Sequence, residues 1–316
     1  MRYSGTLLCF FFLLQFGTAY AVTPASHHVN NQVIALEIDK KTLEAHLRTW
    51  PEDHSKSRLV AIFKVAIGKA QGDKQVEGDN KTPEGIYFAQ REFAGVKLPK
   101  KYGATAIPID FPNPVDLLDK KTGHGIWLHG VESDDRVKEA NVTEGCVAFH
   151  NKDILSLTNW LRPHHGYIII ADGLGDVNVD SDLRSLKQQA YNWINAWQLR
   201  DIDRYISHYA KDFKFKRKNL KSYKRYKKQV FRSYRRMDVK VSNLRAFSHP
   251  KYAMTIMNQD FNGDNRYFSV GRKILYWKRD KNRQWKIIHE VFEKRRVEGV
   301  SVSLDSINVQ NPQTNL

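Results

Sequence analysis

Two residues of this chain have the types and surroundings that nucleophilic catalysis requires. Cys146 follows Thr143-Glu144-Gly145, and His129 lies near the end of the run Gly125-Ile126-Trp127-Leu128-His129-Gly130. A cysteine attacks as the thiolate, so a thiol that is mostly protonated near neutral pH needs a base such as histidine beside it. The acyl transition state also needs N–H donors for its oxyanion, and a glycine before the cysteine lets the backbone approach closely. The pattern therefore predicts a cysteine acyltransferase.

A β-sheet must bring these two residues together. Residues 125–128 are apolar enough for a strand that ends at His129, and 146 − 129 = 17 residues leave room for a loop that returns to the same end of the sheet. Other strands are expected at 32–38, 58–67, 86–88, 106–111 and 166–171, with 58–67 and 166–171 buried. Residues 69–82 are predicted to be a polar loop, and 153–161 a helix with Asn151 as its N-cap. Residues 29–172 are thus mostly β.

The second half of the chain has a different periodicity. Residues 173–182 are polar and turn-rich, as expected of a linker, and apolar residues from 183 to 213 then recur at helical spacing. Four alternating segments follow at 238–247, 252–261, 266–278 and 284–292, with turns at 262–264 and 280–282. Helices followed by an antiparallel sheet predict an α+β domain over residues 183–296, and residues 297–316 read as a polar tail.

The charge of the chain indicates an anionic partner. Its formal net charge is +17, and residues 211–236 hold thirteen Lys or Arg against the single acid Asp212. Aromatic residues within this run would suit single-stranded nucleic acid in a cytosolic protein. The alternative is a solvated helical face that holds the protein near an anionic cell wall or membrane surface, or that has no partner.

The N-terminus predicts export. Arg2, the apolar run from Leu7 to Phe16 and the small-x-small site Ala19-Tyr20-Ala21 form a signal peptide over residues 1–21. Its removal would take Cys9 with it and leave Cys146 as the single thiol, unable to form an internal disulfide. We therefore expect a protein of the periplasm or cell envelope, and no nucleic-acid partner.

The motifs around His129 and Cys146 resemble those of the L,D-transpeptidase (YkuD-like) family, over residues 29–172. An upstream feature also matches, because Ala66-Ile67-Gly68-Lys69 opens a loop that closes at Lys81-Thr82-Pro83-Glu84-Gly85. The resemblance implies that Cys146 is the nucleophile and His129 the general base, oriented by the backbone carbonyl of Gly130. It also implies an oxyanion hole from the N–H groups of Gly145 and Cys146, in a turn shaped by Thr143.

The sequence departs from the family pattern near the expected substrate mouth. Glu144 stands where most members have a second histidine, and Ala148 where many have Arg or Asn. Glu144 and Trp127 are candidate mouth residues, and the identity of the acceptor stays open because Glu144 could repel an acidic acceptor or bind an amine.

The second half resembles the nuclear-transport-factor-two-like (SnoaL-like) cone fold, on residues that include Trp197-Gln198-Leu199-Arg200-Asp201, Gly271-Arg272-Lys273 and Trp285-Lys286-Ile287-Ile288. Members that join both domains include carboxypeptidases that trim stem tetrapeptides to tripeptides, and some relatives release lipoprotein from the wall. The resemblance therefore implies a thioester formed with a peptidoglycan stem peptide at an L-centre to D-residue bond. Either an amine (transpeptidation) or water (L,D-carboxypeptidase action) would then resolve it.

One other interpretation remains open on the residues alone. A non-catalytic cationic cell-wall-binding protein would account for the charge and the second domain without any role for Cys146.

The pairs His27-His28 and His164-His165 lack neighbouring acids or cysteines, so we expect no metal and no cofactor. His124 is expected in a loop, and Asp201 and Asp203 at a helix end.

Overall fold

The computed structural model describes residues 33–51, 57–94, 98–163 and 165–295. The predicted signal peptide and C-terminal tail, together with His27, His28 and His164, lie outside the described residues. Among the helices that the structure describes, none is both long and apolar enough to cross a bilayer.

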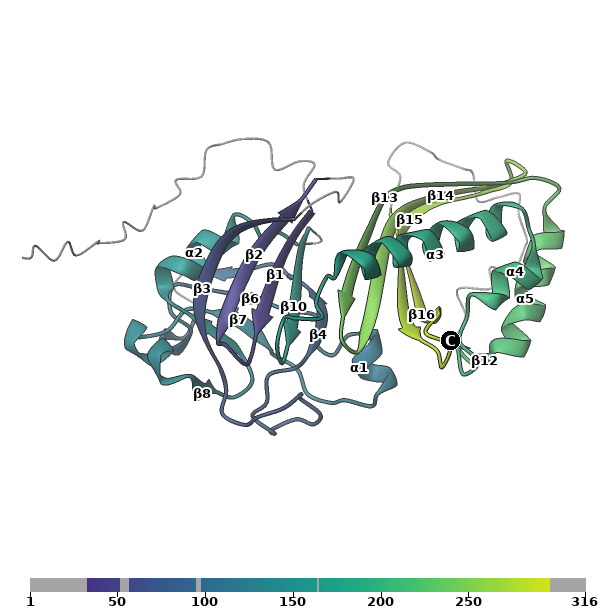
Figure 1. The fold of residues 1–316 in the computed structure, drawn as a ribbon. Coiled ribbons are helices and arrows are strands. Elements are labelled where there is room, and N and C mark those ends of the chain that lie inside the picture. The colour runs from purple at the N-terminus through teal and green to yellow at the C-terminus, as the bar shows by residue number, and fades with distance from the viewer. Residues whose placement is uncertain (1–32, 52–56, 95–97, 164, 296–316) are drawn as a thin grey trace, which may run out of the picture. The chain divides into compact units, whose positions relative to one another are not determined.

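The first domain is built on one large mixed sheet (Figure 1). Over the described residues it has ten strands in the order β4-β10-β1-β2-β3-β9-β7-β6-β5, with β8 paired to β3. The strands are β1 (Val33–Asp39), β2 (Glu44–Trp50), β3 (Arg58–Gly68), β4 (Gly85–Phe88), β5 (Phe93–Ala94), β6 (Thr105–Pro108), β7 (Trp127–His129), β8 (Asn141–Thr143), β9 (Val147–Phe149) and β10 (Gly166–Ala171). The helices are α1 (Pro114–Leu118), α2 (Asn151–Thr158) and the short 3₁₀ segments η2 (Lys100–Tyr102) and η3 (Asp134–Glu139).

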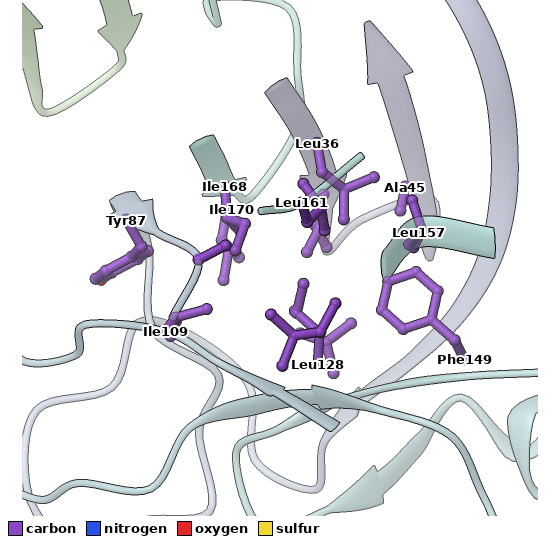
Figure 2. Close-up of a cluster of buried hydrophobic side chains, with 14 of the residues drawn as sticks. Leu36, Ala45, Tyr87, Ile109, Leu128, Phe149, Leu157, Leu161, Ile168 and Ile170 are labelled. Carbon is purple, nitrogen blue, oxygen red and sulfur yellow. The ribbon is translucent and has the colours of Figure 1, made fainter. Parts of the chain in front are cut away.

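One face of this sheet packs into an apolar core (Figure 2). Leu128 of β7 and Phe149 of β9 lie there with Leu36 and Ile168 from the strands across the sheet, and Leu157 of α2 packs against them. All five are fully buried, and burial of each such Leu, Ile or Phe contributes about 1.5–3 kcal/mol. The core therefore fixes the backbone of the two strands that border Cys146 and His129.

The second domain is a four-stranded antiparallel sheet with helices on one face (Figure 1). Its elements are α3 (Asp180–Gln198), α4 (Ile202–Ser207), β11 (Lys214–Phe215), β12 (Lys218–Asn219), α5 (Leu220–Ser233), β13 (Met237–His249), β14 (Tyr252–Gly263), β15 (Tyr267–Arg279) and β16 (Trp285–Lys294). The apolar stripe of α3, with Leu186, Ala190, Trp193 and Trp197, is buried against the sheet. The fold class predicted from the sequence, a mostly β domain followed by an α+β cone-shaped domain, is confirmed.

The opposite face of the four-stranded sheet is also apolar, and it packs on strands of the first domain. Met254, Ile256 and Tyr276 share a buried cluster with Ile86 of β4 and Ile169 of β10. Because β1, β4 and β10 thus have apolar neighbours on both faces, every described residue in them is buried. The two domains therefore share a core, which the sequence did not reveal.

Several local predictions were wrong. Asn151 is the first residue of α2, not its N-cap; His150 is the cap, and no side chain caps this helix. The Asn151 side chain instead accepts from the Ala104 N–H at 2.8 Å and donates to the Val131 carbonyl at 2.7 Å, ties that its sequence position cannot indicate. The segment 58–67 is a strand, but its first half is only partly buried: Leu59 and Ile62 are exposed, whereas Val60, Ala61 and Phe63 pack at the margin of the core.

The second domain was predicted more closely. The four strands are confirmed, as is the hairpin turn near 280–282, whereas the turn predicted at 262–264 lies at 264–266. Asp201 does cap a helix, since its side chain accepts from the Arg204 N–H at 3.0 Å. The helical segment 183–213 is interrupted, because Arg200 has a positive φ of 57° between α3 and α4. The basic run 211–236 is a short hairpin followed by α5, and α3 begins at Asp180, inside the residues predicted as linker.

Candidate active site

Parallel pairing of β7 with β9 places Cys146, which directly precedes β9, beside the start of β7, whereas His129 is the last residue of β7. Leu128 pairs with Val147 and His129 with Ala148. Leu128 and Val147 both point into the core. Since side chains alternate along a strand, His129 points to the opposite face, and Cys146 directly precedes Val147. The loop of η3 and β8 thus returns the chain to the strand that carries His129.

The sulfur of Cys146 lies against the backbone of the segment that leads to His129. The Trp127 N–H points at Sγ from 3.4 Å, and Sγ lies 3.6 Å from the Gly125 carbonyl. Cys146 is partly buried, whereas His129 is only 5% exposed. The nucleophile candidate is therefore only partly accessible, and the base candidate is held in a packed environment.

The ring of His129 is fixed in one tautomer. Its Nδ1 lies 2.5 Å from the Gly130 carbonyl oxygen, which can only accept, so Nδ1 carries the proton. Nε2 is left with a lone pair that can take a proton from another group. The Tyr102 ring packs edge-on against the imidazole, with centroids 5.1 Å apart. The Gly130 carbonyl thus lies where it can orient the His129 ring.

Burial shifts the two pKa values in opposite directions. It lowers the pKa of His129 to about 4, although the Gly130 carbonyl opposes this shift. Burial also raises the pKa of the Cys146 thiol above its usual value, although the Trp127 N–H lowers it. Both groups are therefore neutral at neutral pH, and proton transfer to the imidazole would have to accompany the attack of sulfur.

The turn before Cys146 is held by Thr143. Its hydroxyl donates to the Cys146 carbonyl at 2.7 Å and accepts from the Gly145 N–H at 3.2 Å. Gly145 has a φ of 123°, and a Cβ there would lie 2.8 Å from the Lys81 carbonyl oxygen, so only glycine fits. The Gly145 N–H already donates to the Thr143 hydroxyl. To stabilise an oxyanion as well, this N–H would have to donate to both acceptors.

The loop between β3 and β4 packs on this turn. The Thr82 hydroxyl accepts from the Gly68 N–H at 2.9 Å and lies 3.5 Å from the Cys146 carbonyl, and the Lys69 N–H donates to Thr143 O at 2.9 Å. Lys40, buried at the end of β1, donates to the Thr82 carbonyl at 3.0 Å. The sequence motif around Thr82 indicated this loop, but no local signal indicated Lys40.

Aromatic side chains border the site on one side. Trp127 is partly buried, and its ring contacts those of Tyr102 and Phe93, with centroids 4.8 and 5.5 Å apart. Glu144 is exposed. Tyr102 and Phe93 were missed from the sequence because they lie in a separate segment of the chain.

The remaining candidates lie outside this constellation. His124 is exposed in a loop. Within the described ranges, no three His, Cys, Asp or Glu side chains are grouped so that they could hold a metal ion.

The second domain holds a buried polar cluster of its own. The Glu290 carboxylate accepts from the Tyr223 hydroxyl and pairs with Lys273 at 2.7 Å, and the Tyr209 hydroxyl lies 3.2 Å from it. Burial alone would raise the pKa of Glu290, but Lys273 and Lys227 lower it to about 2, so the carboxylate is ionised. This cluster was not found from the sequence because its members come from separate segments of the chain.

Comparisons with known proteins agree with the fold. Residues 36–177 match the L,D-transpeptidase (YkuD) catalytic domain, and residues 185–291 match the Cds6 C-terminal NTF2-like domain. The chain therefore combines a catalytic domain of the L,D-transpeptidase family with a C-terminal NTF2-like domain, as the sequence motifs predicted.

Individual related proteins match different fractions of this chain. Escherichia coli YafK, whose name marks it as a candidate L,D-transpeptidase, is 27% identical over 153 residues, which are 46% of this chain and 56% of YafK. The chain thus spans just over half the length of that relative. The structure of Bdellovibrio bacteriovorus Bd1075 is similar over 84% of this chain and 94% of its own, with a TM-score of 0.71 and 27% identity.

The fold is also that of the helical cell shape determining protein Pgp2 from Campylobacter jejuni. The two are similar over 83% of this chain and 92% of Pgp2, with a TM-score of 0.69 and 24% identity. Both two-domain structures cover most of the present chain, so the joined architecture recurs in these proteins.

Proposed function

We propose that this chain is an exported cysteine enzyme that forms a thioester between Cys146 and a peptidoglycan stem peptide. The observation that carries the proposal is the pairing of β7 with β9, together with the single tautomer of His129. Membership of the L,D-transpeptidase catalytic-domain family supports peptidoglycan as the substrate. The predicted signal peptide supports a periplasmic or envelope location.

The first chemical step cleaves the bond between an L-centre and a D-residue. Cys146 Sγ attacks the carbonyl carbon while its proton passes to His129 Nε2. The C–N bond then breaks, and the leaving amine takes the proton from His129, which leaves a thioester on sulfur. The Cys146 N–H, with a shared Gly145 N–H, would donate to the oxyanion.

The second step releases the acyl group. Water or an amine attacks the thioester while His129 accepts its proton, and the thiol is reprotonated as it leaves. Water yields a shortened stem peptide, whereas an amine yields a crosslink or an attached protein. The exposed carboxylate of Glu144 lies next to Gly145 in the turn that leads to Cys146, which makes it a candidate for acceptor selection.

The direct test uses purified protein and defined tetrapeptide muropeptides, with mass spectrometry of the products. We expect wild-type protein to yield tripeptides or crosslinked products and Cys146→Ala to yield neither. His129→Gln, which keeps an amide in place of the base, should lose most turnover. Products that are unchanged by Cys146→Ala would refute the thioester mechanism.

A second candidate, a non-catalytic cationic wall-binding protein, is favoured by the surface of α5. Arg225, Lys228 and Arg232 are exposed on this helix, as an anionic wall or membrane surface would require. This surface would also serve the enzyme by retaining it near its substrate. Replacing the three residues by Gln should weaken pelleting with isolated sacculi, and the wall-binding reading alone predicts that Cys146→Ala has no effect on function.

A further inference from the structure

A charged cluster joins the loop beside Cys146 to the second domain. The loop contributes Asp73 and Glu84, whose side chains are 12% and 9% exposed. Lys251, in the turn between β13 and β14, contacts both, with Nζ 2.8 Å from Asp73 Oδ2 and 2.7 Å from Glu84 Oε2. The second domain thus supplies, through Lys251, a salt-bridge partner for two nearly buried carboxylates of the first domain.

The same carboxylates organise the loop itself. The Glu84 N–H donates to Asp73 Oδ1 at 2.8 Å, so the two acids hold the beginning and the end of the loop together. Lys40 and Lys121 bind them from the first domain, at 2.9 Å to Glu84 and 2.8 Å to Asp73. Burial alone would raise the pKa of both acids, but the hydrogen bonds from these lysines and Lys251 lower it below the usual value. Both acids are therefore ionised and depend on cationic partners.

The turn that carries Lys251 is itself rigidly seated. The Lys251 N–H donates to His249 Nδ1 at 3.1 Å, so the proton of this ring is on Nε2, which donates to the Ile170 carbonyl at 3.0 Å. The buried Tyr252 hydroxyl accepts from the Ile86 N–H at 2.6 Å and from Asn113 Nδ2 at 2.8 Å. These hydrogen bonds therefore fix the backbone from which the Lys251 side chain extends.

The loop transmits this position to the nucleophile. Thr82, two residues before Glu84, contacts the Cys146 carbonyl. The Lys81 carbonyl oxygen packs against Gly145, in the space that a Cβ at that position would occupy. A shift of the loop would therefore displace the turn that aims Sγ and the backbone donors beside it.

We propose that Lys251 of the C-terminal domain is a positioning residue for the reaction at Cys146, acting through Asp73, Glu84 and the loop that joins them. This inference rests on the proposed function of Cys146. It makes the NTF2-like domain a structural part of the active site, because without the turn at Lys251 two ionised and nearly buried carboxylates lose a cation. Small displacements of reacting groups cost as much as about a hundredfold in rate.

The test compares full-length Lys251→Met, which keeps the aliphatic stem, with Lys251→Arg, which can still bridge both carboxylates. Lys240→Met, an exposed lysine on β13, is the matched control. On defined tetrapeptide muropeptides we expect Lys251→Met to lower kcat by about tenfold to a hundredfold with KM nearly unchanged. Lys251→Arg should recover most of the turnover, and Glu84→Gln, which removes a partner from the other side, should resemble Lys251→Met.

Hydrogen exchange supplies a readout that does not depend on the reaction. We expect faster amide exchange over residues 69–84 and 143–147 in Lys251→Met, and wild-type exchange in Lys240→Met. Unchanged kcat in Lys251→Met overturns the inference even if the loop is loosened, and so does a loss that Lys251→Arg fails to rescue. The two proposals fail separately. If wild-type protein yields no products, or if Cys146→Ala yields the same products as wild type, the proposed function fails. If hydrogen exchange over residues 143–147 is the same in Lys251→Met as in wild type, the positioning inference fails, whatever the result for Cys146.

Discussion

At the scale of single residues, burial does most of the chemical preparation at this site. It disfavours the charged forms of both Cys146 and His129, which raises the pKa of the thiol and lowers that of the imidazole. The sulfur is thus not a standing thiolate, and in the proposed mechanism it becomes nucleophilic only as the imidazole takes its proton. Such a pair resists modification between turnovers because the thiolate is the reactive form.

The His129 pKa predicts where activity is lost in acid. Protonated His129 cannot accept a proton, so turnover should fall as pH drops through about 4, not through the ordinary histidine value near 6.5. The measurement is kcat/KM for muropeptide cleavage from pH 3.5 to 8, with circular dichroism at each pH to confirm that the protein is folded. An acidic limb centred near pH 6.5 in folded protein would contradict this account.

At the scale of elements, the turn between β13 and β14 is one of the polar links between the domains. His249 stands at its start with only 4% of its surface exposed, and burial lowers its pKa to about 4. A neutral ring is required there, because Nδ1 accepts from Lys251 while Nε2 donates to Ile170.

This histidine predicts a pH-dependent loss of stability. Between pH 6.5 and 4 the unfolded chain binds a proton at residue 249 that the folded chain does not, so the free energy of unfolding falls as pH falls. His249→Gln keeps a donor and an acceptor but does not titrate. The stability of wild type relative to this variant should therefore drop by about 1.4 kcal/mol per pH unit across that window. Urea unfolding of both proteins at pH 5 and pH 7 measures the difference, and a constant difference would show that the ring titrates normally.

At the scale of the whole molecule, the two domains share apolar surface that neither can cover alone. The strands β1, β4 and β10 turn one face to the core of the first domain and the other to β14 and β15. The four-stranded sheet likewise lies between its own helices and the first domain. The chain therefore behaves as one folding unit in this region, although two family domains are recognisable in it.

Separating the domains should expose this surface. A chain that ends at Gly175 would leave Ile86, Phe88 and Ile169 without their partners on β14 and β15. We expect it to aggregate or to form oligomers, because exposed apolar patches of this kind promote association. Size-exclusion chromatography with light scattering measures this, and co-expression of residues 176–316 should restore solubility. A monodisperse monomer with the thermal stability of the full chain would contradict the shared core.

Local patterns were sufficient for much of this protein. Period-two alternation and the turn residues located β13 to β16, and helical spacing located the stripe of α3 on which Trp193 and Trp197 lie. These patterns succeed because they express burial of one face of a single element, which depends only on nearby residues. The proposed roles of Cys146, His129 and Gly130 were also readable, because each lies in a short motif.

Contacts between residues far apart in the sequence could not be predicted from local patterns. Lys251 and Asp73 are 178 positions apart, and Tyr252 and Ile86 are 166 apart, so no window of sequence contains both partners. The error at Asn151 has the same origin, because its side chain is used by Ala104 and Val131 in place of its own helix. A side chain with several possible partners takes the one that the fold brings near.

By itself, the sequence determined many of the elements that form, which residues have the chemistry of a nucleophile and a base, and which two domain families are joined. Only the tertiary structure decided that the second domain's sheet closes the core of the first, and that Lys251 reaches the loop beside Cys146. The physical reason is that amphipathic patterning specifies that a face must be buried but not what covers it. The covering surface is selected by the packing of the complete chain.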